Sequence, residues 1–272
     1  MFIVVLIELV ALNGCDIGVD MVMDTMSSTD TGMEDVVDAM SSTDTEMTDA
    51  TDMVPPMDEI VDAPPDMAVK LVWLISYPFG GKDAYIAWVA SVAPTLQAPE
   101  EVKRVASYDN YYGETPHRLV EFEFDSFADA STYLNRPDIA AVLEALPDHS
   151  SEVSTHVYVQ RSDYSKNQAA SRKIKSVYLI DYPLGGKDAY LEWVASIAQS
   201  LQDPEEIKRI ASYDNYYGEN PHRLVEFEFD SIEDANSYQE RPELQAVNAE
   251  LPNRAGSVTL LTFELRSDYV NE

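Results

Sequence analysis

The chain has 272 residues, which is enough for two domains of ordinary size, and it carries a formal net charge of −31. The first 69 residues contain sixteen acidic residues and no basic ones, and the rest of the chain contains 18 basic and 33 acidic residues. This surplus of negative charge argues against binding to nucleic acid and against binding to membranes through charge, because phosphates and anionic headgroups are repelled. Cys15 is the only cysteine, so no intrachain disulfide can form.

Residues 1–15 have the pattern of a signal segment. The stretch from Phe2 to Leu12 is apolar apart from Glu8, and it is too short to span a bilayer. The tetrapeptide LNGC that ends at Cys15 resembles the lipobox of bacterial lipoproteins, whose cysteine is lipidated and becomes the mature N-terminus. The resemblance implies lipidation at Cys15 and a location in the bacterial cell envelope, lipid-anchored at the outer membrane or the cell surface. The alternative is an ordinary disordered N-terminus with a chance cysteine.

Residues 16–69 are rich in Asp, Met, Thr and Ser, and they contain two Pro-Pro pairs and a short repeat with a period of fourteen residues. This period matches neither the heptads of a coiled coil nor a strand pattern. We therefore expect a disordered acidic tether over residues 16–69.

Two long segments of the chain are copies of one another. Residues 70–164 align with residues 175–269 at a constant offset of 105 and without a gap. Over the first 57 positions 44 are identical, whereas over the remaining 38 only 14 are. An internal repeat of this length indicates duplicated structural units. We expect repeat 1 at 70–164, a linker at 165–174 and repeat 2 at 175–272.

Each copy predicts the same order of strands and helices. In repeat 1 the strands are expected, from short β-favouring runs, at 71–77, 102–112, 117–125 and 153–160. A helix is expected at 82–96, after the Gly80-Gly81 turn, because its apolar residues recur on one face. A second helix is expected at 127–146, with a break at Pro137 and an end at Pro147.

The order β-α-β-β-α-β, with the motifs GGKDAY at 80–85 and PHRLVEFEF at 116–124, resembles the ferredoxin-like unit of the dimeric α/β-barrel proteins. These include the EthD-like and antibiotic-biosynthesis monooxygenase-like families. The resemblance implies an α+β fold in which two ferredoxin-like βαββαβ repeats pack sheet to sheet as a pseudo-dimeric α/β barrel. A physical argument favours the same arrangement, because an antiparallel sheet with both helices on one face leaves its other face uncovered.

Alternation along the third strand of each repeat separates large apolar residues from carboxylates. The apolar residues are expected to face the helices, which puts the carboxylates on the opposite face of the sheet. If that face lines a barrel interior, the carboxylates must be paired, protonated or bound to a cation, and the interior becomes a candidate ligand site. The alternative, favoured from the strand pattern alone, places them at the rim or in open solvent. These carboxylates are Glu121, Glu123, Glu226 and Glu228.

The densest group of functional side chains surrounds the turn between the second and third strands. Tyrosines beside a histidine and a carboxylate could bind an aromatic ligand and position a general base. The alternative is that the aromatic residues serve only as strand residues and cross-strand partners. The ligand-binding candidates are Tyr108, Asp109, Tyr111, Arg118, Tyr213, Asp214, Tyr216 and Arg223, and the candidate catalytic residues are His117 and His222. The sequence contains no zinc-ligand spacing, no nucleophile elbow and no dinucleotide fingerprint.

We therefore expect an envelope-anchored module whose barrel binds a small molecule or a partner, with no cofactor and no metal of its own. It would be a monomer with an internal pseudo-dimer, would bind no nucleic acid, and would meet a membrane only through its lipid anchor. The alternative is a cofactor-independent EthD-like or monooxygenase-like enzyme that acts on an aromatic or polyketide-like substrate. A third class is a purely structural surface protein, which an interior filled with apolar side chains would favour.

Overall fold

The computed structural model describes residues 67–166 and 173–271, all of which belong to one compact unit, Ala63–Glu272. The predicted signal segment, the lipidation site Cys15 and nearly all of the predicted tether lie outside the described residues. No helix among the described residues is long and apolar enough to cross a membrane.

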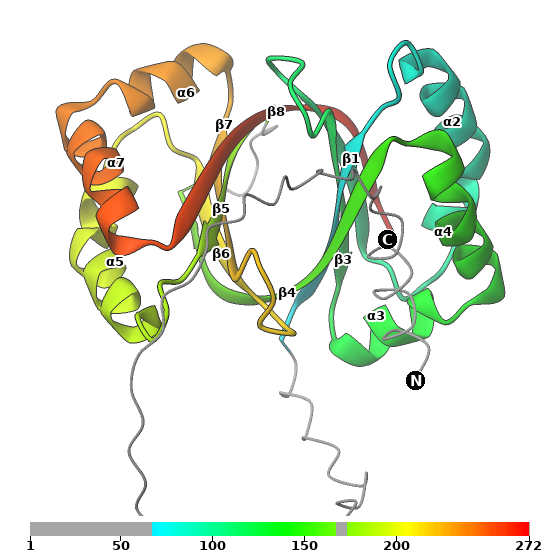
Figure 1. Cartoon of the computed structure of the whole chain (residues 1–272), viewed down its shortest axis with the longest axis horizontal. Coiled ribbons are helices and arrows are strands. Elements are labelled where there is room, and N and C mark those ends of the chain that lie inside the picture. Colours follow the sequence, from blue (N-terminus) through cyan, green and yellow to red (C-terminus); the bar gives the residue numbers. More distant parts are fainter. Residues whose placement is uncertain (1–66, 167–172, 272) are drawn as a thin grey trace, which may run out of the picture. The chain divides into compact units, whose positions relative to one another are not determined.

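Eight strands form one closed antiparallel barrel (Figure 1), in the order β1-β3-β2-β8-β5-β7-β6-β4. The first repeat supplies β1 (Val69–Ser76), β2 (Arg104–Asn110), β3 (Arg118–Phe124) and β4 (Glu152–Ser165). The second supplies β5 (Ile174–Asp181), β6 (Arg209–Asn215), β7 (Arg223–Phe229) and β8 (Ser257–Val270). Every pair of neighbouring strands is antiparallel.

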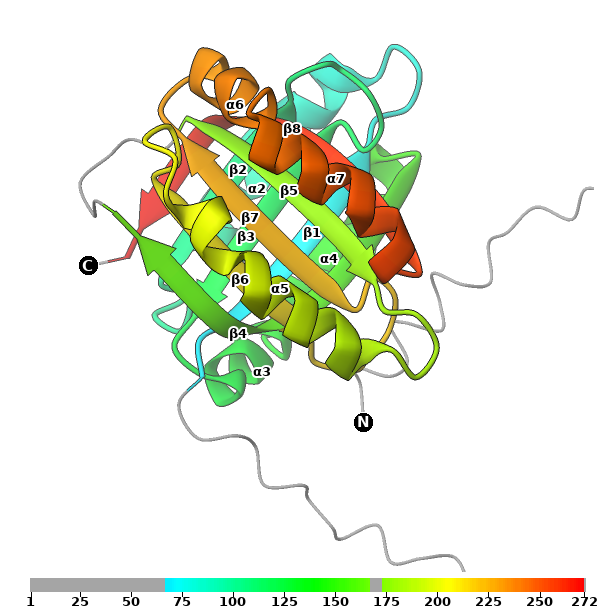
Figure 2. The same ribbon diagram turned by 90° about the vertical axis from the view of Figure 1, so that its left-hand side faces the viewer.

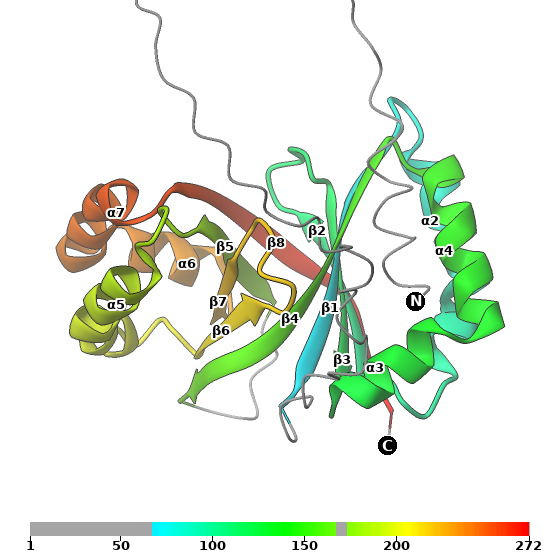
Figure 3. The same cartoon turned by 60° about the horizontal axis from the view of Figure 1, so that its bottom comes forward.

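The predicted fold class, two ferredoxin-like βαββαβ repeats packed sheet to sheet as a pseudo-dimeric α/β barrel, is wrong. The strands do not form two separate sheets, because β4 and β8 each have 14 residues and join the two repeats. The first half of β4 pairs with β1 of its own repeat, and the second half pairs with β6 of the other repeat. Figure 3 shows β4 crossing between these two neighbours, and β8 crosses likewise from β5 to β2. Closure leaves no unpaired sheet edge, which stabilises the single barrel over two open sheets.

Six helices are described, and they cover the outside of the barrel, as Figure 2 shows for the second repeat. They are α2 (Lys82–Gln97), α3 (Phe127–Leu134), α4 (Pro137–His149), α5 (Lys187–Gln202), α6 (Ile232–Gln239) and α7 (Pro242–Arg254). The break expected at Pro137 separates α3 from α4, and Pro137 occupies the first turn of α4, where its missing N–H costs nothing. The expected end at Pro147 is wrong, because α4 continues through it to His149.

Three groups of buried apolar residues stabilise the fold. Two lie between the helices and the outer face of the barrel, one in each repeat. In repeat 1, Phe122 and Phe124 of β3 pack against Tyr133 of α3, with ring centroids 5.8 and 5.2 Å apart. The third group fills part of the barrel interior and takes residues from both repeats, among them Val72, Tyr108 and Phe263. The residues that alternate with the outer aromatic residues therefore point into the barrel, and these include the glutamates.

Candidate functional site

Four charged side chains meet in the barrel interior and form the interior charge cluster, which consists of Lys70, Lys175, Glu121 and Glu226. The ammonium group of Lys70 lies 2.8 Å from both carboxylate oxygens of Glu226. Lys175 lies 2.8 and 2.7 Å from those of Glu121, and 3.2 Å from Glu226. All four side chains are at most 2% exposed. The open-solvent alternative therefore does not hold for these two glutamates.

Aromatic rings and arginines complete the cluster at nearly symmetric positions. The ring of Tyr213 lies 4.4 Å from the Lys70 ammonium, and the ring of Tyr108 lies 4.5 Å from that of Lys175. Glu123 pairs with Arg104 at 3.2 Å and is partly exposed, and Glu228 pairs with Arg209 at 3.0 Å and is buried. Six of the predicted ligand-binding residues thus serve a paired interior network, namely Tyr108, Tyr213, Glu121, Glu123, Glu226 and Glu228.

The ionisation of the cluster follows from burial and from mutual distance. Against the effect of burial, the carboxylates of Glu121 and Glu226 raise the pKa of Lys70 and of Lys175. Burial and the neighbouring Glu226 carboxylate raise the pKa of Glu121 to about 7. Against burial, Lys175 and Lys70 hold the pKa of Glu226 well below its ordinary value. The two carboxylates titrate as a pair, which takes its first proton near neutral pH and its second far below.

The two lysines are the partners that sequence reasoning missed. Each lies near the start of the first strand of its repeat and is two and four residues before interior residues, which are Val72 and Leu74 in repeat 1 and Val177 and Leu179 in repeat 2. Because residues two apart on a strand share a face, this spacing could have placed Lys70 and Lys175 on the same face as the glutamates. Apolar side chains fill much of the remaining interior, so the cluster has the character of packing and pairing rather than of a ligand cavity.

The predicted residues Asp109, Arg118, Asp214 and Arg223 lie on the outer face of the barrel, away from the cluster. Arg223 donates to Asp214 at 3.1 Å and to the hydroxyl of Ser212 at 2.9 Å, and its Nε has no partner among the described residues. Arg118 makes the equivalent contacts with Asp109 at 3.4 Å and Ser107 at 2.8 Å. The structure therefore divides the predicted site between two sides of the sheet.

Backbone N–H groups fix both candidate catalytic histidines. The N–H of Tyr77 donates to Nδ1 of His117 at 3.0 Å, and the N–H of Tyr182 donates to Nδ1 of His222 at 3.3 Å. For a neutral His117 ring this contact leaves Nε2 as the nitrogen that carries the proton. A carboxylate oxygen of Asp181 lies 3.3 Å from Nδ1 of His222, and the first repeat has Ser76 at the equivalent position. The backbone contacts position both histidine rings, and a catalytic role for them stays a prediction.

The turns that carry Tyr111 and Tyr216 differ between the two repeats. Both turns reach the opposite repeat, since the N–H of Tyr111 donates to the carbonyl of Thr262, and that of Tyr216 to the carbonyl of Val157, at 2.8 Å in each case. The ring of Tyr216 stacks on Phe127 with centroids 4.4 Å apart. Ile232 is the counterpart of Phe127, and the ring of Tyr111 remains 43% exposed.

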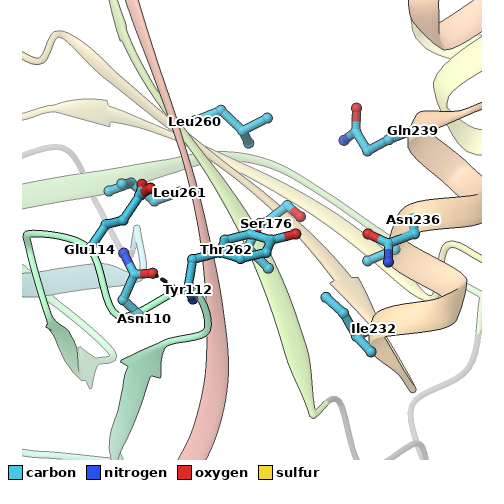
Figure 4. Close-up of a pocket in the computed structure, with 11 residues that line it drawn as sticks. Asn110, Tyr112, Glu114, Ser176, Ile232, Asn236, Gln239, Leu260, Leu261 and Thr262 are labelled. Atoms are coloured by element: carbon cyan, nitrogen blue, oxygen red, sulfur yellow. Dashed lines mark hydrogen bonds between the residues drawn. The ribbon is translucent and has the colours of Figure 1, made fainter.

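A pocket of about 550 Å³ lies where that stack is missing, and we call it the loop pocket. Figure 4 shows the turn residues Asn110, Tyr112 and Glu114 on one side and α6 on the other. Its other lining residues are Ser176, Ile232, Ala235, Asn236, Gln239, Leu260, Leu261 and Thr262. The volume lies within the range of roughly 300–1,000 Å³ that is typical of small-molecule sites.

A second, smaller cavity of about 120 Å³ lies between the barrel and helices α5 and α7, and we call it the interlayer cavity. Tyr190, Trp193 and Phe227 give it aromatic walls, and Arg223 and Asn248 contribute polar groups. Its size is close to the ~150 Å³ of an engineered apolar cavity that holds benzene.

Five positions around these two cavities are polar in repeat 2 where repeat 1 has more apolar residues. The substitutions are Leu71 to Ser176, Trp73 to Tyr178, Leu134 to Gln239, Leu143 to Asn248 and Val157 to Thr262. Three of the polar residues line the loop pocket, and two line the interlayer cavity. Gln239 donates to the hydroxyl of Tyr178 at 3.1 Å and accepts from Asn248 at 2.8 Å, which connects the walls of the two cavities.

Comparison with known proteins shows the fold only. The sequence matches no family model, and no curated protein matches it. The structure is similar to that of an anthrone oxidase-like protein, with 10% identity, a TM-score of 0.60, and coverage of 76% of this chain and 94% of that chain. It is also similar to a candidate monooxygenase of Fusobacterium nucleatum, with 8% identity, a TM-score of 0.58, and coverage of 76% of this chain and 95% of that chain. A candidate monooxygenase of Lactobacillus acidophilus is similar too, with 11% identity, a TM-score of 0.53, and coverage of 75% of this chain and 97% of that chain.

No cluster of three or more metal-ligating side chains occurs among the residues that the structure describes. At these low identities the comparisons support a shared barrel architecture and carry no activity over to this chain. The assignment of a site therefore rests on the differences between the two repeats.

Proposed function

We propose that the protein is a small-molecule binding module and that its principal site is the loop pocket, which lies between a turn of the first repeat and the second repeat. The observation that carries this proposal is the set of five polar replacements around the two cavities of that repeat. Polar groups between a sheet and its helices stabilise a fold less well than apolar ones, because their loss of water must be offset by hydrogen bonds. Their concentration at one place is the expected signature of a binding site.

The unpaired polar groups in the loop pocket support the proposal. The side chains of Ser176, Asn236 and Thr262 line it and make no hydrogen bond in the described part of the chain. Ser176 is only 3% exposed and lies in the wall of the pocket. A ligand that supplied partners to these groups would gain hydrogen bonds at low cost, because the groups are already held in place.

Restoring the residues of repeat 1 tests this proposal. The S176L/T262V variant gives the pocket the leucine and valine that repeat 1 has at the equivalent positions, 71 and 157. We expect it to fold with an unchanged or higher thermal midpoint and to lose ligand binding, measured by native mass spectrometry against a broad metabolite panel. The L71S/V157T variant is the matched control and should retain binding. Absence of any bound metabolite on the wild-type protein, or equal binding by S176L/T262V, would refute the proposal.

The alternative is a cofactor-independent enzyme that acts on an aromatic substrate in the interlayer cavity. Two observations favour it: the aromatic walls of that cavity, and the buried Arg223, which is 4% exposed and has an unpartnered Nε. The names of the similar structures point to the same class of chemistry. A substrate oxygen could accept from this Nε while its ring fills the cavity. Incubation of the same panel in air, followed by mass analysis, tests the alternative, and unchanged masses would remove it.

A further inference from the structure

We infer that the loop pocket takes a small organic cation, an amine attached to an apolar body. This inference rests on the proposed function and names the ligand class of the same site. The observations behind it are the charge of the lining residues, the exposed tyrosine that lines the pocket together with the one carboxylate, and the Tyr216–Phe127 stack at the equivalent turn.

The lining of the pocket contains one charged residue, Glu114, and no basic one. The Glu114 carboxylate makes no ion pair or hydrogen bond within the described residues. An ammonium group would therefore meet an unpaired opposite charge, whereas a carboxylate or phosphate ligand would be repelled. The folded part of the chain has many more acidic than basic residues, and its field favours the approach of a cation.

An aromatic residue two positions before this carboxylate, Tyr112, lines the same pocket. Tyr112 is 61% exposed, and its ring meets that of Tyr111 edge to face, with centroids 5.3 Å apart. The edge contact holds the two rings in a fixed relative orientation and leaves Tyr112 open to the pocket (Figure 4). A tyrosine face and a carboxylate together form a recognised environment for an ammonium group.

The opposite wall suits the rest of such a ligand. Ile232 and Leu260 offer apolar surface, and the amide of Asn236 on α6 offers both a donor and an acceptor. These groups favour a body with an apolar part and one or two hydrogen-bonding atoms. They do not provide the charged donors that a negatively charged group on the ligand would need.

The turn of the second repeat supplies an internal comparison for this inference. Glu219 and Tyr217 occupy that turn, where the ring of Tyr216 stacks on Phe127 of the first repeat. The same carboxylate and tyrosine are thus present twice, and of the two pairs Glu114 and Tyr112 are the ones that line the loop pocket. Changes at Glu114 and Glu219 alter the net charge equally and differ only in their distance from that pocket.

Three probes with one ring system and different charges test the inference on the full chain. They are tryptamine, its neutral alcohol analogue tryptophol, and indole-3-propionate. We expect tryptamine to bind most tightly and indole-3-propionate least tightly, by chemical-shift titration at low salt. E114Q should weaken tryptamine about fivefold, the effect of an exposed charge pair, and E219Q should leave the affinity unchanged. I232F places the phenylalanine of repeat 1 in the pocket and should abolish binding of all three probes.

The outcomes separate the ligand class from the site. Equal affinities for the three probes, or equal effects of E114Q and E219Q, would overturn the amine inference while leaving a small-molecule site in place. Binding that survives I232F in a folded protein, verified by circular dichroism, would overturn both the inference and the proposed function. Loss of tryptamine affinity on raising the salt concentration is expected as well, since the contact is with an exposed carboxylate.

Discussion

Removal of one lysine from the interior charge cluster should destabilise the protein strongly. Lys70 lies 2.8 Å from both oxygens of Glu226, and both side chains are at most 2% exposed. Lys70→Met keeps most of the apolar stem and removes the charge, so that two buried carboxylates face a single ammonium, that of Lys175. Breaking a buried ion pair in this way costs about 3–5 kcal/mol. That is a large share of the roughly 5–15 kcal/mol by which a domain is stable.

Urea unfolding at pH 7.5, followed by tryptophan fluorescence, measures this loss. Two controls bracket it. Lys103→Met removes an exposed pair at 3.4 Å to Asp125, whose side chains are 47% and 72% exposed, and should cost less than about 1 kcal/mol. The K70M/E226L double variant removes both partners and leaves Lys175 paired with Glu121, so it should recover most of the stability lost in K70M.

The loss should also depend on pH, with a sign that follows from the structure. In K70M the pKa of Glu226 rises in the folded state, because burial is no longer offset by Lys70. The folded protein then binds a proton that the unfolded chain, with an ordinary pKa near 4.5, does not bind. The deficit relative to wild type should therefore shrink as the pH falls from 7.5 toward 4.5. A loss below about 1 kcal/mol at pH 7.5, or a loss that is the same at pH 5 and 7.5, would refute the reasoning.

Two further predictions concern a local contact and the N-terminus. Ser126 and Ser231 each accept a hydrogen bond at 3.1 Å from the N–H three residues later, at the start of α3 and α6. S126A and S231A should therefore each lower the free energy of unfolding by about 1 kcal/mol. An unchanged urea midpoint in both variants would contradict the capping role. If Cys15 is lipidated, the protein should incorporate labelled palmitate and partition with envelope membranes in its host, and C15S should do neither. Equal partitioning of the wild-type protein and C15S would refute the predicted lipid anchor.

The sequence predicts the local elements well and their assembly poorly. Strands and helices follow from periodicity and from breakers such as Pro137, and apart from the longer β4 and β8 each lies close to its predicted range. The closed barrel escapes this reasoning because the second half of β4, Arg161–Ser165, is polar and lacks an apolar alternation. Its pairing with β6 is set by contacts between the repeats, such as Arg161 with Asp214 at 2.6 Å. Such contacts join residues that are far apart in the chain, and a local pattern does not encode them.

The candidate site was only partly accessible from the sequence for a related reason. The polar replacements in repeat 2 can be found by comparing the two copies, but they are scattered from Ser176 to Thr262. Only the fold brings them to the walls of two neighbouring cavities. The densest sequence motif, around Tyr108 and Asp109, proved to be divided by the sheet, because adjacent strand residues point to opposite faces.

The long strands that cross between the repeats also bear on how such a chain can change over generations. A deletion that removed either copy would leave half of β4 or β8 without a partner, and it would also open one seven-residue strand, β2 or β6, to pairing with other molecules. Each copy thus supplies strand partners that the other copy needs in the closed barrel. The two repeats need not stay identical in sequence, because each is a separate segment of one chain. A residue in one repeat can therefore be replaced without the same replacement at the equivalent position of the other.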